Sequence, residues 1–129
     1  MTNFSSSARI RKHSPAAINA TATATAAEVI TGWITSTSAA ETTITLPTGT
    51  LLGGALNAVQ GTTMDLYIDN TAGASGLFVA VAVNGVLSDA AVDSAASFGD
   101  LIVTFGVTGL ACFRIMFSSA TAYVFTRIS

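Results

Sequence analysis

The sequence of 129 residues predicts an all-β protein: an antiparallel, jelly-roll-like β-sandwich with one short helix and an extended N-terminal arm. Three observations predict this fold class. About eight short runs of β-branched and aromatic residues are separated by turn signals roughly every ten residues, the spacing of antiparallel sandwiches and small barrels. Only one longer run has helical spacing. The basic residues gather at one end, which separates an arm (1–17) from a body (18–129).

The arm is basic, whereas the body is acidic. Arg9, Arg11 and Lys12 supply three of the five positive charges of the chain, and all seven acidic residues lie in the body. Two positive against seven negative side chains give the body a formal charge of −5. The arm is also rich in serine and poor in residues that form a core. We therefore expect it to become ordered only on a partner surface.

The first half of the body predicts a helical turn followed by two strands. Thr25 and Glu28 have the spacing of a capping box, which predicts a turn of helix that Gly32 closes. Two β-branched runs, 33–37 and 42–46, predict strands joined as a hairpin or through a bulged connection.

A longer helix is expected after Thr48, whose side chain caps its start. Apolar residues at positions 51, 52, 55, 56 and 59 have helical spacing, and Gly61 ends the run. Gly53 and Gly54 each weaken a helix by about 1 kcal/mol relative to alanine. The helix should therefore form only by packing its leucine stripe on a sheet.

The second half of the chain predicts strands separated by turns. Residues 64–69 alternate apolar and polar side chains, the pattern of a half-buried strand. Residues 77–83 are continuously apolar, which predicts a strand covered on both faces. Asn84 and Gly85 predict a type I′ turn, after which 86–87 pair back as a hairpin. Three further strands complete the set: 101–107, 111–117 and 122–128.

The strand predicted over 111–117 has one fully apolar face, formed by Phe113, Ile115 and Phe117. Only 9% of all residues are charged, against about a quarter in a typical soluble domain. A monomer with so few charges is prone to self-association. We therefore expect an oligomer or a lattice component, with this face or its strand neighbours as the interface. A monomeric domain rich in Thr, Ser and Ala is the alternative.

Side chains able to support catalysis are few, so we expect no enzymatic activity, no cofactor and no metal site. The only histidine, His13, lies in the arm, where a general base cannot be held in place. Asp65 and Asp69 share one strand face; they either bind a cation or solvate that face, and they are the only candidates for a small glycan hydrolase. The single Cys112 has no histidine partner to activate it.

The positive charges of the arm also raise the question of nucleic-acid binding. Three or four charges give little affinity for phosphates at physiological salt, and the acidic body lacks a basic-aromatic platform. An acidic protein surface is therefore the expected partner. No run reaches the ~20 apolar residues of a membrane-spanning helix, and no Leu-rich block marks a signal peptide. We expect no membrane partner.

Four pieces of the chain carry a family resemblance: TAAEVITGWIT (25–35), ITLPTGTLLGGAL (44–56), GTTMDLYIDNTAGAS (61–75) and FRIMFSSATAYVFTRIS (113–129). In this order they resemble small structural proteins of tailed bacteriophages, which are commonly virion, head-fibre or capsid decoration proteins. The resemblance covers 25–129. The basic arm has no counterpart in the family pattern, and no catalytic residues come with the resemblance.

The resemblance implies a phage virion protein. Together with the charge-poor body and the basic arm, it leads us to expect a capsid decoration, or cement, protein that binds the outer surface of the major capsid protein lattice as a homotrimer and stabilises the head. The residues expected to bind the capsid lie in the arm: Arg9, Ile10, Arg11, Lys12 and His13. The protein would be assembled in the host cytoplasm and lie on the exterior of the virion. A minor component of the shell is one alternative. Another is a tail or head-fibre protein that binds host glycans, with Trp33 or Tyr67 as stacking platforms.

Overall fold

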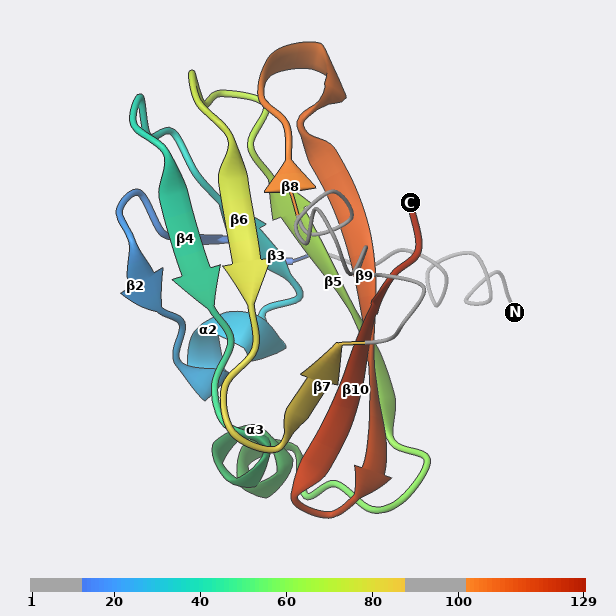
Figure 1. The fold of residues 1–129 in the computed structure, drawn as a ribbon. Coiled ribbons are helices and arrows are strands. Elements are labelled where there is room, and N and C mark those ends of the chain that lie inside the picture. The colour runs from blue at the N-terminus through green and yellow to red at the C-terminus, as the bar shows by residue number, and fades with distance from the viewer. Residues whose placement is uncertain (1–12, 88–101) are drawn as a thin grey trace, which may run out of the picture.

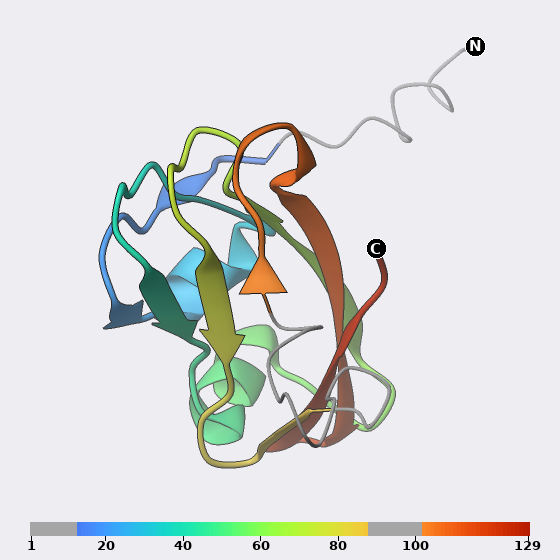
Figure 2. The ribbon, with the colours of Figure 1, turned by 45° about the horizontal axis from the view of Figure 1, so that its top comes forward.

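A computed structural model describes residues 13–87 and 102–129 of the protein. Two β-sheets face each other across one hydrophobic core (Figure 1 and Figure 2). The larger sheet has six strands in the order β1-β3-β5-β9-β10-β7, and the smaller has four in the order β2-β4-β6-β8.

The strands of the larger sheet are β1 (Ala16–Ala17), β3 (Trp33–Thr35), β5 (Thr63–Asp69), β9 (Leu110–Ser119), β10 (Ala122–Arg127) and β7 (Gly85–Leu87). The strands of the smaller sheet are β2 (Ala22–Thr23), β4 (Thr42–Thr45), β6 (Leu77–Ala80) and β8 (Ile102–Val103). The helices are α2 (Ala26–Ile30), α3 (Gly49–Leu56) and the 3-10 turn η3 (Gly106–Thr108).

Successive strands alternate between the two sheets from β1 to β8. Odd-numbered strands join the larger sheet and even-numbered strands join the smaller one, so the described chain changes sheet at each step. Neighbouring strands from β1 to β5 in the larger sheet, and from β2 to β8 in the smaller sheet, are therefore two strands apart in chain order. Of these, β1–β3, β3–β5, β2–β4 and β4–β6 are parallel pairs. Helix α2 lies on the crossing from β2 to β3, and α3 lies on the crossing from β4 to β5.

The prediction of an all-β antiparallel, jelly-roll-like sandwich was wrong. Over the described residues the fold is mixed α/β, with two α-helices and with parallel as well as antiparallel pairs. Among the described residues, antiparallel pairing occurs between β5 and β9, β9 and β10, and β6 and β8. The physical reason lies in the connections. A parallel pair needs a crossover rather than a tight turn, and here the crossover runs through the opposite sheet.

Two predicted hairpins are absent for the same reason. β3 and β4 lie in different sheets, and so do β6 and β7. Asn84 has a φ of 64°, as a type I′ turn requires at its first central position. Gly85, however, begins β7, which pairs in parallel with β10. The turn therefore redirects the chain to the opposite sheet and does not fold it back.

Both helix starts agree with the sequence prediction. Thr25 and Glu28 form the complete capping box of α2, with hydrogen bonds of 2.9 and 3.1 Å. The side chain of Thr48 caps α3. Helix α3 ends earlier than predicted, at Leu56, because Asn57 adopts the left-handed conformation with a φ of 51°.

Helix α3 packs closely on the turn between β9 and β10. Leu52 is fully buried, whereas Leu51 is 62% exposed, so only part of the predicted leucine stripe enters the core. A Cβ at Gly53 would overlap the carbonyl oxygen of Ala120 in that turn. The glycine that weakens the isolated helix is thus the residue that permits its approach to the sheet.

Strand β9 supplies the centre of the core. Phe113, Ile115 and Phe117 are 0%, 0% and 2% exposed. Phe113 stacks on Phe125 with ring centroids 4.8 Å apart, and Phe117 meets Tyr123 edge-on at 5.7 Å. The face predicted to form the oligomer interface is therefore interior to the single chain. Its side chains cannot reach a second subunit unless the sandwich opens, because the smaller sheet and the helices cover them.

Two buried polar side chains connect loops to this core. The side-chain nitrogen of Asn70, a residue 1% exposed, donates hydrogen bonds to the carbonyl oxygens of Ser75, Val103 and Thr104. The hydroxyl of Tyr123 donates to the carbonyl oxygen of Pro47 at 2.8 Å. Burial raises the pKa of Tyr123 to about 12.

The pKa of Tyr123 predicts a loss of stability in alkali. In the unfolded chain a tyrosine titrates near pH 10, so the unfolded state releases this proton first. The free energy of unfolding should therefore fall as the pH rises from about 10 to about 12. Tyr123→Phe should flatten this dependence. At neutral pH it should cost about 1 kcal/mol, because the Pro47 carbonyl loses its donor.

Denaturant unfolding of both proteins across this pH range measures the effect. Tyr67, whose pKa is also raised, is present in both proteins, so the difference between them isolates Tyr123. An equal slope in the two proteins would assign the alkaline loss to another group.

Candidate functional site

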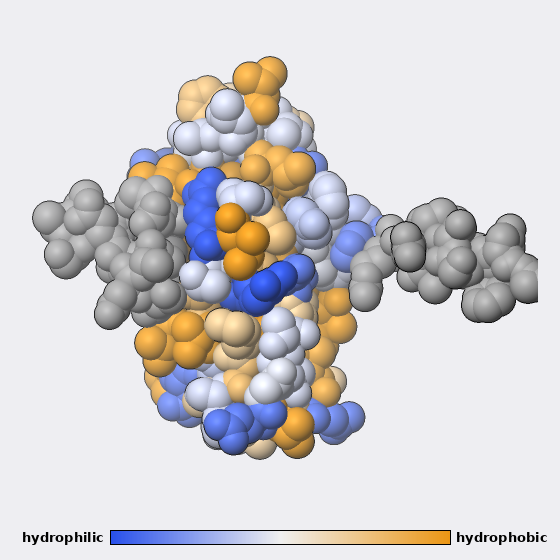
Figure 3. All heavy atoms as spheres, turned by 90° about the vertical axis from the view of Figure 1, so that its right-hand side faces the viewer, coloured by the Kyte–Doolittle hydropathy of each residue, from blue (hydrophilic) through white to orange (hydrophobic). Residues whose placement is uncertain are grey.

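The outer face of the larger sheet carries aligned side chains from three strands. The parallel register of β3 and β5 places Trp33 opposite Tyr67. The antiparallel register of β5 and β9 places Tyr67 opposite Cys112, and Asp65 opposite Arg114. Because side chains alternate along a strand, all five belong to the face turned away from the core. Figure 3 views the molecule from the side of β9 and β10, where hydrophilic and hydrophobic residues are interspersed.

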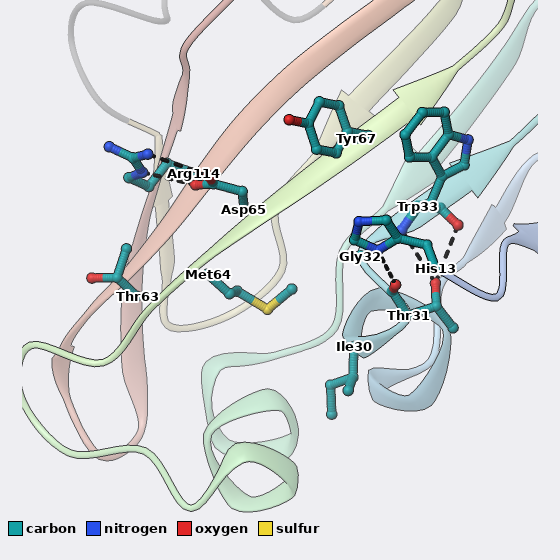
Figure 4. A pocket seen from close by; sticks show the side chains of 10 residues that line it. All are labelled: His13, Ile30, Thr31, Gly32, Trp33, Thr63, Met64, Asp65, Tyr67 and Arg114. Carbon is teal, nitrogen blue, oxygen red and sulfur yellow. Dashed lines mark hydrogen bonds and ion pairs between the residues drawn. The ribbon is translucent and has the colours of Figure 1, made fainter. Parts of the chain in front are cut away.

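Part of this face is hollowed into a pocket with a volume of about 950 Å³ (Figure 4). We call it the outer groove; its principal side chains are His13, Trp33, Asp65, Tyr67 and Arg114. Figure 4 shows Arg114 and Asp65 on one side of the hollow, and Trp33 and His13 on the other. The groove thus has a charged wall and an aromatic wall.

Three aromatic rings form the aromatic wall. Trp33 and Tyr67 stack with ring centroids 5.0 Å apart and an interplanar angle of 28°. The imidazole of His13 lies 5.7 Å from the ring of Trp33 and 6.2 Å from that of Tyr67. Aromatic pairs at such distances add about 0.5–1.5 kcal/mol beyond the burial of their area. The rings therefore hold one another in place.

His13 is held in the groove by a backbone acceptor and by a glycine. Its Nδ1 lies 2.9 Å from the carbonyl oxygen of Thr31, which accepts a hydrogen bond when this nitrogen carries the proton. Gly32 has a φ of 79°, a conformation that favours glycine. A Cβ at Gly32 would lie 2.8 Å from Nδ1 of His13. The absence of a side chain at position 32 therefore makes room for the imidazole.

The structure places His13 differently from the sequence analysis, which assigned it to the arm as part of the capsid-binding segment. The imidazole lies against the body, and Ala16 and Ala17 pair with Ile34 and Thr35 of β3. Residues 13–17 thus contact the larger sheet.

Arg114 and Asp65 form a bidentate ion pair. The Nε–Oδ1 distance is 2.8 Å and the Nη2–Oδ2 distance is 3.3 Å. The hydrogen bond with Asp65, and then its charge, raise the pKa of Arg114. The two side chains are 42% and 40% exposed, and exposed pairs contribute at most about 1 kcal/mol to stability. The pair therefore matters mainly as a fixed arrangement of donors and acceptors.

Cys112 lies next to the phenol of Tyr67 and is 8% exposed. Burial, followed by the negative charge of Asp65, raises the pKa of its thiol. A raised pKa keeps the thiol protonated at neutral pH, and the thiol is a poor nucleophile. Cys112 is thus suited to packing and not to covalent chemistry.

The two aspartates that share a face have separate partners. Asp65 pairs with Arg114, whereas Asp69 accepts hydrogen bonds from the backbone N–H and the hydroxyl of Thr71 at 2.9 and 2.6 Å. Asp69 does not line the groove. The structure therefore does not bring the two carboxylates together as a cation site.

Within residues 13–87 and 102–129, no three His, Cys, Asp or Glu side chains lie close enough together to hold a metal ion. No helix in these ranges has the length and hydrophobicity needed to cross a membrane. Four residues of the predicted capsid-binding segment lie outside the described residues: Arg9, Ile10, Arg11 and Lys12.

Trp33 and Tyr67 were predicted as aromatic platforms, but their pairing and the roles of Gly32 and Arg114 were not predicted. The alternation of polar and apolar side chains along β5 was visible in the sequence, and it places Asp65 and Tyr67 on the same face. The partner of each, however, depends on the parallel register with β3 and the antiparallel register with β9. A hairpin between the two β-branched runs of 33–46 would have placed Trp33 elsewhere.

Comparison with known proteins adds no assignment. No family model matches the chain, and neither a curated protein nor a solved structure matches it significantly. The phage resemblance therefore depends only on the sequence pieces quoted above.

The contact between Gly32 and His13 predicts non-additive effects on stability. Gly32→Ala should lower the free energy of unfolding by about 2–3 kcal/mol, because it combines backbone strain with displacement of the imidazole. His13→Ala should cost about 1 kcal/mol. The double variant has no imidazole to displace. Its loss in free energy of unfolding should therefore be smaller than the sum of the two single losses by at least about 0.5 kcal/mol.

Denaturant unfolding of the four proteins measures this coupling. Because the chain has one histidine, the NMR signals of its ring also report the displacement directly. Gly61→Ala is the matched control: Gly61 has a φ of 96° and open space where a Cβ would stand. It should combine additively with His13→Ala, and equal additivity for Gly32→Ala would contradict the proposed contact.

Proposed function

We propose that the protein is a capsid decoration protein of a tailed bacteriophage, which binds the outer surface of the major capsid protein lattice and stabilises the head. Two lines of argument support this proposal. One is the resemblance of residues 25–129 to small phage structural proteins. The other is the combination of a basic arm with a charge-poor body, which suits adhesion to an acidic protein surface.

The observation that supports the proposal most is the fixed origin of the basic arm. Lys12 directly precedes His13, which the outer groove holds through Thr31 and the aromatic rings. An extended chain spans at most about 3.5 Å per residue, so the four residue steps from His13 to Arg9 limit the separation of their Cα atoms to about 14 Å. An arm with a fixed origin searches less space before it binds, which lowers the entropic cost of binding.

The proposed mechanism is adhesion without a chemical step. The arm is attracted to an acidic surface of the capsid protein, while the body of formal charge −5 disfavours binding in other orientations. In a trimer, three arms engage together. The second and third then bind at a high effective concentration, so the avidity exceeds the affinity of one arm.

Deleting residues 1–12 should abolish binding to heads while leaving the body folded, because all the described contacts remain. Replacing Arg9, Arg11 and Lys12 by glutamine should weaken binding at least about tenfold, and added salt should weaken binding of the parent protein. The matched control, Arg9→Lys with Arg11→Lys, keeps the charge and should keep most of the affinity. Co-sedimentation with heads that lack the protein measures this. Equally tight binding by the truncated protein would exclude the arm as the attachment.

A subunit interface has to use side chains other than the buried row of β9. One exposed apolar row crosses the outer face of the larger sheet. The register aligns Met116 with Val124 and Val124 with Val86, and Met116 and Val86 are 39% and 56% exposed. Met116 lies on the outer face of β9, the strand predicted to make the interface, and we assign the trimer contact to this row.

Light scattering on the purified protein should give the mass of three chains. Val86→Glu with Met116→Glu should give monomers, because charges would be buried without partners. Val107→Glu is the control, since Val107 is fully exposed and lies in η3, far from β7 (Figure 1). A monomeric parent protein would remove the trimer from the proposal.

A further inference from the structure

We propose that the outer groove binds a neutral saccharide, independently of the attachment of the arm to a capsid. The ligand class is a pyranose sugar without ionic groups, alone or within an oligosaccharide. The inference is carried by the two unlike walls of the groove, one aromatic and one a neutralised ion pair, that face the same hollow.

The aromatic wall fits the less polar face of a sugar ring. Trp33 and Tyr67 are each half-buried, and their stacked rings line the hollow (Figure 4). A pyranose presents C–H groups on its faces and hydroxyls around its rim. Ligand sites commonly combine a flat apolar surface with a few fixed polar groups, and stacking against these rings would leave the hydroxyls pointing to the groove walls.

The charged wall fits the hydroxyls. A carboxylate only accepts hydrogen bonds, and a guanidinium only donates them, whereas a hydroxyl does both. Two adjacent hydroxyls can therefore bind Asp65 and Arg114 together. The register of β5 and β9 already holds this pair, with an Nε–Oδ1 distance of 2.8 Å. Binding then requires little new ordering of side chains.

The same ion pair selects against charged sugars. Asp65 and Arg114 neutralise each other, so the wall offers no net charge to an ionic ligand. An anionic sugar that approaches Arg114 also meets the carboxylate of Asp65, and a cationic sugar that approaches Asp65 also meets the guanidinium. Selection by repulsion of this kind favours a neutral ligand.

The groove is suited to binding and not to cleavage. Hydrolysis of a glycosidic bond generally needs two carboxylic groups on opposite sides of the bond. Asp65 is the carboxylate that lines the groove among the described residues, and it is committed to Arg114. Asp69 is engaged by Thr71 and lies outside the lining. A bound saccharide should therefore remain intact.

The site contains its own optical probe, since Trp33 is the only tryptophan in the chain. The full-length protein is titrated with methyl α-glucoside, methyl β-galactoside, N-acetylglucosamine and maltotriose, while indole fluorescence is recorded. We expect a saturable change with at least one neutral sugar, with a Kd of about 1 mM or below. Glucuronic acid and glucosamine should bind at least about tenfold more weakly than glucose derivatives without charge. No saturable change with any neutral probe, or equal binding of the charged ones, would overturn the proposal.

Variants of both walls locate the binding. Tyr67→Ala removes the stacking partner, and Arg114→Met removes the donor; each should weaken binding at least about tenfold. Tyr67→Phe keeps the ring and should bind within about twofold of the parent. Val107→Ala, remote from the groove, should not change binding. Unchanged affinity in both Tyr67→Ala and Arg114→Met would overturn the assignment to this groove.

Two further measurements make the result independent of folding and of the capsid proposal. Circular dichroism and thermal unfolding confirm that Tyr67→Ala and Arg114→Met are folded before their affinities are compared. Head binding is then measured for Arg114→Met, which keeps the basic arm and should still co-sediment. Loss of sugar binding with retained head binding supports the saccharide site. Loss of both would show that the groove is part of the capsid contact and would overturn the independence stated above.

Discussion

The pairing of β9 with β5 on one side and β10 on the other is the constraint on which the rest of the structure depends. It places Phe113, Ile115 and Phe117 in the core, and it places Cys112 and Arg114 on the opposite face beside Tyr67 and Asp65. Because the side-chain period of a strand is two, a slip by one residue would exchange these faces. The same strand register therefore determines which side chains enter the core and which line the outer groove, so a change of register would alter both.

Local features of the fold were readable from the sequence because their causes are local. The capping box at Thr25 and the cap at Thr48 need only a few adjacent residues, and both formed as predicted. The alternation in β5 was also readable. The assignment of strands to sheets was not, because it depends on contacts between residues far apart in the chain. Asn84 illustrates the difference: its positive φ was predictable, whereas the direction in which it sends the chain was not.

The site was predictable only in part. Trp33 and Tyr67 were recognised as candidate aromatic platforms, but a position along the chain does not show which strand lies beside it. His13 meets Gly32 because β1 pairs in parallel with β3, and it meets Tyr67 because β5 pairs with the other side of β3. The apolar face of β9 was assigned to the outside, although Arg114 on the opposite face marks that face as the one turned to solvent. A charged residue within a strand indicates its outward side more reliably than an apolar row indicates an interface.

The alternation of strands between sheets has a consequence for synthesis on the ribosome. Strands β1, β3 and β5 can align as they emerge, but the free edge of β5 has no partner until β9, near the C-terminus, has been translated. Folds dominated by such distant pairings form slowly, and incomplete chains expose strand edges that attract other chains. The nascent protein should therefore depend on chaperones, or on rapid completion of translation, to reach its final form without aggregating.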